Sequence, residues 1–324
     1  MRYAVLVVLV TAVFAGCLSP LTGETSFSSV EKSYSVEHIV EVGGELAVLG
    51  QANGTTFIKY SGERYGSDVY VANPGVFEVG GRLAYVFSEP GTANDSLWYD
   101  GTVHGGRFNE VWSPVLVDGK LVFQAQVGTG QEQVIVRGGK IIDDRYSVST
   151  SPAAVDGRLA YEAFEDGNEY IVHGDRVYGP YDRVNSPEEV AGELGYWYRN
   201  GSGYVYRLGN RQLKTEQRLV RVLTIDGKVT AVTANGTDVS IRVGDRTYGQ
   251  DTGLIYPSSV IGVGSVPAYL AEVNGTDRVV LGNAVVDGNY TVTPDAVGDH
   301  IAAIGGRLVF AAQEGRDWHV YRQQ

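Results

Sequence analysis

Short apolar stretches that end in glycine-containing turns follow one another along most of the chain. The segment AAVDGRLAYEAFEDGNEYIVHGDR, at residues 153–176, shows the pattern clearly. Its Asp-Gly pairs supply the positive φ angles that two-residue hairpin turns need. Valine, threonine and tyrosine are common in the chain, and these residues pack well on pleated sheet surfaces. The segment therefore predicts four antiparallel strands, at about 153–155, 158–164, 170–173 and 176–181.

The same pattern recurs at a nearly constant spacing. An apolar stretch, a turn glycine and a further strand occur eight times, and successive turn glycines lie 35 to 42 residues apart. These glycines are Gly44, Gly81, Gly119, Gly157, Gly192, Gly227, Gly264 and Gly306. A second tight turn repeats with the same period in the first seven units, from residues 62–64 to residues 282–284. A fixed period of this size predicts a solenoid, a propeller or another array of stacked units.

Each unit, read as four antiparallel strands, resembles one blade of a β-propeller. A single blade cannot bury both of its faces, but blades stacked around an axis can. The last unit ends before its fourth strand, and a spare segment, Thr25–Val36, precedes the first unit. We therefore predict an all-β fold, an eight-bladed β-propeller of four-stranded antiparallel blades. The N-terminal segment would supply the outermost strand of the last blade and so close the ring.

A seven-bladed ring with one degenerate unit is the alternative. The units that run from Gly192 to Gly227 and from Gly264 to Gly306 match the pattern least well. The chain lacks the Gly-His and Trp-Asp pairs of WD40 repeats and the Ser-x-Asp-x-Gly-x-x-Trp motif of sialidase-type propellers. The turn-and-strand segment resembles the start of a Kelch repeat, but the glycine pair that should follow is missing. The resemblance is to propellers as an architecture, and it implies no particular activity.

The N-terminus predicts export and a lipid anchor. It reads MRYAVLVVLVTAVFAGCLSP, and its weakly polar or apolar run is too short for the roughly 20 residues that span a membrane. The run ends in Ala15-Gly16-Cys17, which resembles a lipoprotein processing box whose cysteine receives a diacylglycerol. We expect a signal peptide at 1–16, a lipidated Cys17 with a polar tether at 17–29, and one propeller domain at 30–324. An ordinary signal peptide followed by an incidental cysteine is the alternative.

Composition narrows the possible partners. The net charge of −12 would repel a polyanion, so we expect no nucleic-acid partner. Cys17 is the one cysteine of the chain, which excludes an internal disulfide. Nothing in the sequence indicates an obligate partner subunit, and we expect a monomer that is attached to the membrane through its lipid.

Six Asn-x-Ser/Thr sequons are candidate N-glycosylation sites on an exported protein. They are Asn53, Asn94, Asn200, Asn235, Asn274 and Asn289. The first five fall in the turns between the second and third strands of their units, so they should lie on one face of the ring. Asparagine and glycine also form such turns for conformational reasons alone, and both interpretations stay open.

The candidates for ligand binding are few. Asp295, Asp299 and His300 lie in the longest insertion between units, and irregular insertions in a regular array often carry function. The five histidines fall at different positions of different units, so we expect no metal site. The sequence shows no nucleophile elbow and no phosphate-binding glycine loop, and we predict no catalytic residues and no cofactor.

Two repeated features have structural explanations as well as functional ones. Basic residues recur in the turns between third and fourth strands, and aspartates recur in the turns between first and second strands. The basic residues are Arg64, Lys140, Arg176, Arg211 and Arg246, and the aspartates are Asp118, Asp156 and Asp226. They could attract an ion or a polar ligand, but turn geometry and protection of an outer strand edge also explain them. Aromatic residues about eleven positions before the turn glycines, such as Phe108 and Tyr181, should pack between blades.

The sequence thus predicts a class of protein rather than a reaction. We expect an extracytoplasmic, lipid-anchored propeller that binds a protein, glycan or envelope partner on one face. One alternative is an extracytoplasmic enzyme of the hydrolase, lyase or quinoprotein type with its site at the mouth of the axial channel. Another is a solute-binding lipoprotein.

Overall fold

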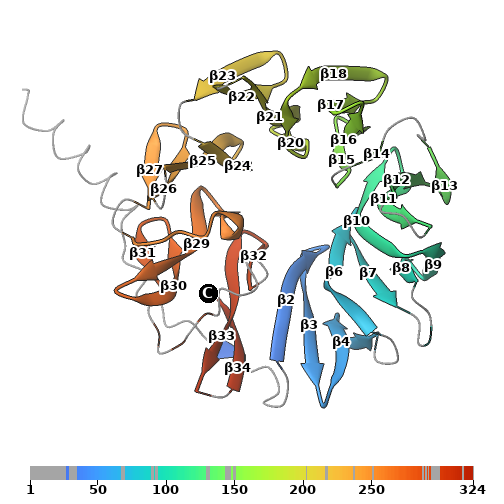
Figure 1. The fold of residues 1–324 in the computed structure, drawn as a ribbon. Coiled ribbons are helices and arrows are strands. Elements are labelled where there is room, and N and C mark those ends of the chain that lie inside the picture. The colour runs from blue at the N-terminus through green and yellow to red at the C-terminus, as the bar shows by residue number, and fades with distance from the viewer. Residues whose placement is uncertain are drawn as a thin grey trace, which may run out of the picture.

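The protein is a ring of eight antiparallel β-sheets, an eight-bladed β-propeller (Figure 1). Each blade has four strand positions, and in the fourth and fifth blades two short strands occupy the innermost position. The computed structural model describes residues 27–28, 35–66, 70–88, 91, 94–128, 132–142, 147–148, 151–201, 203–215, 218–235, 238–249, 252–286, 288, 290, 292, 300–315 and 317–323. The predicted fold class is confirmed. Both units that match the repeat least well form blades of their own, so the seven-bladed alternative is wrong.

The first four blades follow one another along the chain. The first blade comprises β2 (Ser35–Val42), β3 (Glu45–Ala52), β4 (Thr55–Tyr60) and β5 (Glu63–Tyr65). The second comprises β6 (Tyr70–Val79), β7 (Arg82–Ser88), β8 (Asp95–Tyr99) and β9 (Thr102–Phe108). The third comprises β10 (Glu110–Val117), β11 (Lys120–Val127), β12 (Glu132–Arg137) and β13 (Lys140–Ile141). The fourth comprises β14 (Ser147–Val148), β15 (Ala153–Val155), β16 (Arg158–Glu165), β17 (Asn168–His173) and β18 (Arg176–Tyr181).

The other four blades complete the circle. The fifth comprises β19 (Arg183–Val184), β20 (Glu188–Val190), β21 (Glu193–Asn200), β22 (Gly203–Leu208) and β23 (Arg211–Thr215). The sixth comprises β24 (Arg218–Ile225), β25 (Lys228–Asn235), β26 (Asp238–Val243) and β27 (Arg246–Tyr248). A 3₁₀ turn, η1 (Pro257–Ser259), precedes the seventh, which comprises β28 (Ile261–Val263), β29 (Val266–Val273), β30 (Thr276–Leu281) and β31 (Ala284–Val285). The eighth comprises β32 (Ile301–Ile304), β33 (Arg307–Glu314), β34 (Asp317–Arg322) and β1 (Phe27–Ser28).

The chain termini meet in the eighth blade, as predicted. Strand β1 pairs antiparallel with β34, with Phe27 opposite Tyr321 and Ser28 opposite Val320. The predicted extent of this strand needs a correction, because Ser35 and Val36 already belong to β2, the innermost strand of the first blade. The N-terminal segment therefore serves two blades: its start completes the last blade and its end begins the first.

The core consists of eight hydrophobic clusters, and each cluster fills the space between two neighbouring blades. The cluster between the eighth and first blades joins Ile304 and Val320 to Ile39 and Phe57. A blade without its neighbours would expose both apolar faces, which is why the sequence needs the whole circle to fold.

The recurrent aromatic residues pack between blades, as predicted. The Phe108 ring of the second blade meets the Phe123 ring of the third edge-on, with centroids 5.8 Å apart. Tyr181 of the fourth blade stacks on Tyr198 of the fifth at 4.4 Å. The Tyr181 and Tyr196 hydroxyl groups are 2.9 Å apart, a buried hydrogen bond across the same interface. These rings are therefore structural contacts rather than a surface for a ligand.

The order of strands gives the ring two distinct faces. In an antiparallel four-stranded sheet, the turns after the first and third strands lie at one end, and the turn after the second lies at the other. We name the end with the first and third turns the AB face and the opposite end the BC face. In the seventh blade the turn glycine Gly264 occupies the first turn position, whereas Gly44 occupies the second in the first blade, so the register of that unit differs by one residue.

Candidate functional site

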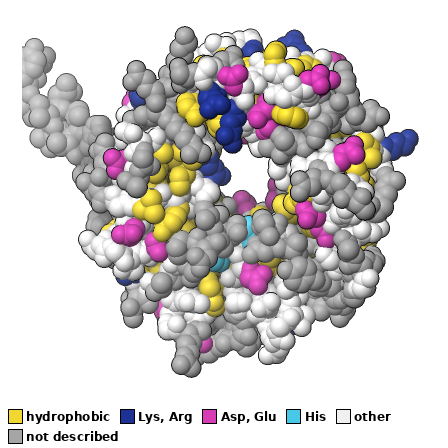
Figure 2. Space-filling view, viewed as in Figure 1, with side chains coloured by type: hydrophobic (Ala, Val, Ile, Leu, Met, Phe, Trp, Pro, Cys, Tyr) yellow, Lys and Arg dark blue, Asp and Glu magenta, His cyan; other side chains and the backbone are white. Residues whose placement is uncertain are grey.

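The innermost strands of the eight blades surround an opening through the middle of the ring (Figure 2). Their sequences contain more acids than bases: six glutamates against three arginines in the strands that the structure describes. The glutamates are Glu37, Glu41, Glu78, Glu110, Glu188 and Glu189, and the arginines are Arg183, Arg218 and Arg221. The innermost strands therefore carry a net negative charge, and their three arginines all lie in the fifth and sixth blades.

Three of these acids occupy one layer near the AB face. Glu41, Glu78 and Glu189 each stand one residue before the last residue of an innermost strand, so they are equivalent in the repeat. The last residues of these strands, Val42, Val79 and Val190, are buried between their own blade and the next one. Because side chains alternate along a strand, the three glutamates face the opposite way, toward the preceding blade.

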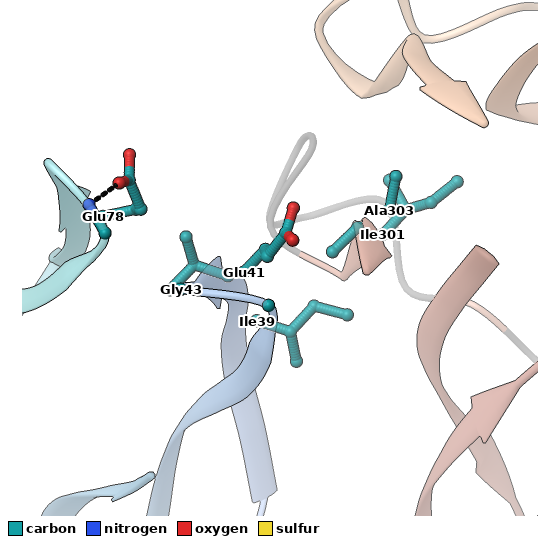
Figure 3. A pocket seen from close by; sticks show the side chains of 10 residues that line it. Ile39, Glu41, Gly43, Glu78, Ile301 and Ala303 are labelled. Carbon is teal, nitrogen blue, oxygen red and sulfur yellow. Dashed lines mark hydrogen bonds between the residues drawn. The ribbon is translucent and has the colours of Figure 1, made fainter. Parts of the chain in front are cut away.

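A cavity of about 450 Å³ lies at this layer, where the first, second and eighth blades meet. Its walls include Ile39 and Glu41 of β2, Ile301 and Ala303 of β32, and Glu78. Figure 3 shows the Glu41 side chain extending from β2 toward the side of Ile301 and Ala303. The Glu78 carboxylate accepts a hydrogen bond from the backbone N–H of Gly81 in its own turn (Figure 3). The cavity thus combines an apolar wall with two carboxylates, a composition that suits a small organic ligand with a polar end.

A second depression, of about 730 Å³, lies between the third and fourth blades on the AB face. Asp118, Arg137, Arg158 and Asp175 line it together with apolar residues. The Arg137 guanidinium lies 3.8 Å from the Asp118 carboxylate and also donates to the Val117 carbonyl at 3.4 Å. Three large apolar side chains near it are unusually exposed: Ile141 at 43%, Ile142 at 42% and Val177 at 46%. The AB face therefore carries two concave sites of different character.

The repeated turn charges do not gather into one site. Arg211 pairs with Glu193 at 2.5 Å, and the Arg64 guanidinium covers the Phe57 ring at 3.7 Å. Asp118, Asp156 and Asp226 have φ angles of 49° to 50°, as first residues of two-residue turns. Turn conformation and local contacts account for these residues, which supports the structural explanation over a ring that binds an ion.

His300 has a structural environment. It is 3% exposed, its Nε2 lies 3.1 Å from the Val36 carbonyl oxygen, and its ring lies 5.1 Å from the Trp318 ring. It thereby links the eighth blade to the first. Asp295 and Asp299 lie outside the described residues, so ligand binding by these three residues stays a prediction.

The sequons lie where the repeat pattern predicts them. Asn53, Asn94 and Asn274 stand in connections between second and third strands, and Asn200 and Asn235 are the last residues of the second strands β21 and β25, so all five lie on the BC face. Asn53 and Asn274 adopt φ angles of 53° and 52°, so they also serve as turn residues. Asn289 and Cys17 lie outside the described residues. The two concave sites and the five sequons therefore occupy opposite faces of the ring.

The acidic layer was missed by sequence reasoning, although the repeat contains a signal for it. Glu41, Glu78 and Glu189 each lie three residues before a turn glycine, so aligning the eight units on those glycines would have placed them in one column. Their common orientation follows from strand alternation. Their closeness to the channel follows only from closure of the ring.

Two kinds of feature are absent from the described residues. These residues contain no group of three or more His, Cys, Asp or Glu side chains that could hold a metal ion. They also contain no helix that is both long enough and apolar enough to cross a membrane.

Comparison with known proteins supports the fold and leaves the activity open. No protein-family model matches the chain, and no curated protein matches it. Among solved structures, one of two prolyl endopeptidases is similar over 88% of this chain, with 10% identity and a TM-score of 0.52. This chain corresponds to 55% of the length of that protein. The β-propeller domain of the Trilobed protease from Pyrococcus furiosus matches 78% of this chain and 96% of its own length, with 11% identity and a TM-score of 0.48. At such identities the likeness concerns the fold alone.

Proposed function

We propose that the protein is an extracytoplasmic, lipid-anchored binding module that holds a protein, glycan or envelope partner on its AB face. The observation that carries this proposal is the division of the ring into two faces. The five described sequons lie on the BC face, whereas both concave sites open on the AB face. Glycans on the BC face would leave the AB face free for a partner.

The position of β1 supports an orientation at the membrane. Strand β1 pairs with the C-terminal half of β34, and β34 runs from the BC face to the AB face. Because the pairing is antiparallel, the chain enters β1 from the AB side. Phe27 is ten residues from Cys17 (27 − 17 = 10), and that length of chain spans at most about 35 Å. A lipid on Cys17 would hold the rim of the eighth blade near the bilayer, with the AB face toward the membrane and the sequons away from it.

The anchor is tested by changing Cys17 to serine. A diacylglyceryl cysteine supplies two acyl chains, enough for stable attachment, so its loss should move the protein from the membrane fraction to the soluble exported fraction. Fractionation of cells that produce Cys17→Ser measures this. Ser26→Ala, a change in the polar tether, should stay with the membrane. Retention of Cys17→Ser in the membrane fraction would contradict the lipid anchor.

The choice of face is tested by photo-crosslinking in intact cells. A benzophenone amino acid is placed either at Lys120, an exposed residue next to the turn on the AB face, or at Asp238, an exposed residue at the BC end of β26. We expect a discrete covalent adduct from position 120 and none from position 238. Adducts from position 238 alone, or from both positions equally, would refute the assignment of the partner to the AB face.

A further inference from the structure

One position of the repeat carries a charge in a single blade. Glu188 of β20 pairs with Gly195 of β21, at the third cross-strand pair counted back from the turn. The equivalent residues of the other seven blades are Val40, Phe77, Val115, Ala153, Leu223, Ile261 and Ala302. All seven are apolar, and all seven belong to a hydrophobic cluster between their own blade and the next. Glu188 therefore places a carboxyl group where the fold otherwise places core.

A second departure from the repeat lies beside the first. Tyr206 of β22 pairs with Trp197, at a position where every other blade has isoleucine, leucine or valine. The equivalents are Ile58, Leu97, Ile135, Ile171, Ile241, Val279 and Val320. Tyr206 is 2% exposed, and its hydroxyl oxygen lies over Gly195, where a β-carbon would collide with it. The equivalents of Gly195, such as Ala47 and Ala160, all carry a β-carbon. The fifth blade thus differs from the others at three neighbouring positions, Glu188, Gly195 and Tyr206. Together these residues place the Tyr206 hydroxyl group over Gly195, the cross-strand partner of Glu188.

The two polar groups face the same interface. Val190 belongs to the cluster between the fifth and sixth blades, together with Tyr206 and Val222. Because side chains alternate along β20, Glu188 faces the same way as Val190. The Tyr206 hydroxyl group is buried, and no described residue forms a hydrogen bond with it. Among the described residues, no basic group lies within ion-pair distance of the Glu188 carboxylate. The carboxyl group therefore lacks a partner of opposite charge in direct contact.

Arg221 of β24 is the positive charge that acts on Glu188. Its guanidinium donates a hydrogen bond to the Ser258 carbonyl, on the side of the seventh blade. Burial raises the pKa of Glu188 to about 7, and the attraction of Arg221 only partly offsets this. Burial also lowers the pKa of Arg221. The carboxylate is thus short of positive charge at neutral pH, although its side chain is only half-buried.

We infer that Glu188, with the Tyr206 hydroxyl group behind it, forms a binding site in the channel wall for a ligand bearing a primary ammonium or guanidinium group. A charged side chain at a core position costs stability, and such a cost is expected where function requires it. The sign of the ligand follows from Glu188 itself, because its carboxylate has no basic group in direct contact among the described residues. Glu189, the next residue of the strand, faces the opposite way, toward the fourth blade. Figure 2 shows acidic and basic side chains together at the rim of the opening.

This inference deepens the proposed function by naming the chemical group that the channel would bind. An arriving cation would supply the charge that Glu188 lacks. The carboxylate could then accept hydrogen bonds from the cation and from Tyr206 at once, and charge-assisted bonds of this kind are among the stronger ones in proteins.

The test uses n-butylammonium chloride as the probe and the purified soluble chain with Cys17→Ser. Glutamate labelled with ¹³C at its carboxyl carbon reports each acid by NMR, and the signal of Glu188 is identified by its absence in Glu188→Gln. We expect saturable shifts of this signal at pH 8 and a lower apparent pKa of Glu188 when the probe is present. Glu188→Gln should weaken binding about tenfold or more, and Tyr206→Phe should weaken it about threefold. Glu272→Gln, on an exposed part of β29, should bind as the parent does.

Two controls make the result decisive. n-Butanol has the same apolar chain without the charge and should leave the Glu188 signal unmoved, as should sodium chloride at equal ionic strength. Binding that survives Glu188→Gln, or that shifts other glutamates but not Glu188, would overturn the inference. The readout needs neither the anchor nor the natural partner. Its failure would therefore leave the AB-face proposal standing, and failure of the crosslinking would leave the cation site standing.

Discussion

Glu188→Leu is expected to make the protein more stable at pH 8, by about 3 kcal/mol. The substitution gives the fifth blade the type of residue that the other seven have at this position. Burial raises the pKa of Glu188 from 4.5 to about 7, and this value already includes the attraction of Arg221. The ionised form is thus favoured less in the folded protein than in the unfolded chain. Equilibrium unfolding in guanidinium chloride measures the difference, with the midpoint and slope followed at fixed pH.

The pH dependence separates the charge from simple repacking. A carboxyl group whose folded pKa is raised binds its proton more tightly in the native state, so the native state is favoured below the unfolded pKa. This stability is lost as the pH rises from about 4.5 to about 7. The advantage of the variants should therefore fall to about 1 kcal/mol at pH 5. Glu188→Gln keeps the size and polarity of the side chain. Its free energy of unfolding should lose the same pH dependence, but its gain in stability at pH 8 should be smaller than that of Glu188→Leu. An advantage of Glu188→Leu that is equal at both pH values would contradict the ionisation argument.

The same pair of variants links stability to binding. If Glu188 is retained for a ligand, the variant that gains stability must lose affinity for n-butylammonium, because one carboxylate is responsible for both effects. Such an exchange of stability for function is common at sites that break a structural rule. A leucine variant with higher stability and unchanged binding would show that the cost serves another purpose.

The repeat made the architecture predictable. Turn glycines such as Gly44 and Gly157 determine where strands begin, because hairpin turns constrain the residues within them. The predicted strands at 153–155 and 176–181 match β15 and β18 at both ends. The unit around Gly264 was harder to recognise because its register is offset by one residue, yet it folds as a full blade.

The candidate site was less accessible to sequence reasoning, for a physical reason. The contacts of Glu188 depend on Tyr206 in another strand and on Arg221 in another blade, and cross-strand register brings them together. Glu188 and Tyr206 are recognised as unusual only when each is compared with the residues at the same position of the other blades. By contrast, His300 in the irregular insertion was predicted as a candidate ligand-binding residue. In the structure it bridges the first and last blades. A residue that differs in type from its equivalents at the same repeat position, such as Glu188, indicated the candidate site better than the irregular insertion did.

A soluble chain that begins at Ser29 is expected to melt at a lower temperature than one that begins at Ser26, and to form oligomers. Both chains lack Cys17 and most of the tether, but only the shorter one lacks Phe27–Ser28, the outermost strand of the eighth blade. Its loss leaves unpaired the backbone N–H and C=O groups of β34 that face Phe27–Ser28. An exposed strand edge of this kind is a template for pairing with another chain. The lost hydrogen bonds alone should cost roughly 2 kcal/mol.

The comparison isolates the strand because the other contacts across the closure are present in both chains. The cluster that joins Ile304 and Val320 to Ile39, and the contact of His300 with the Val36 carbonyl, do not involve β1. The shorter chain should therefore still fold into a ring, but with a weaker closure between the eighth and first blades. Thermal melting followed by circular dichroism reports the stability, and light scattering coupled to gel filtration reports the oligomers. Identical melting temperatures and a monodisperse monomer for both chains would show that the inter-blade cluster alone holds the ring closed, and that β1 serves only to lead the chain toward its anchor.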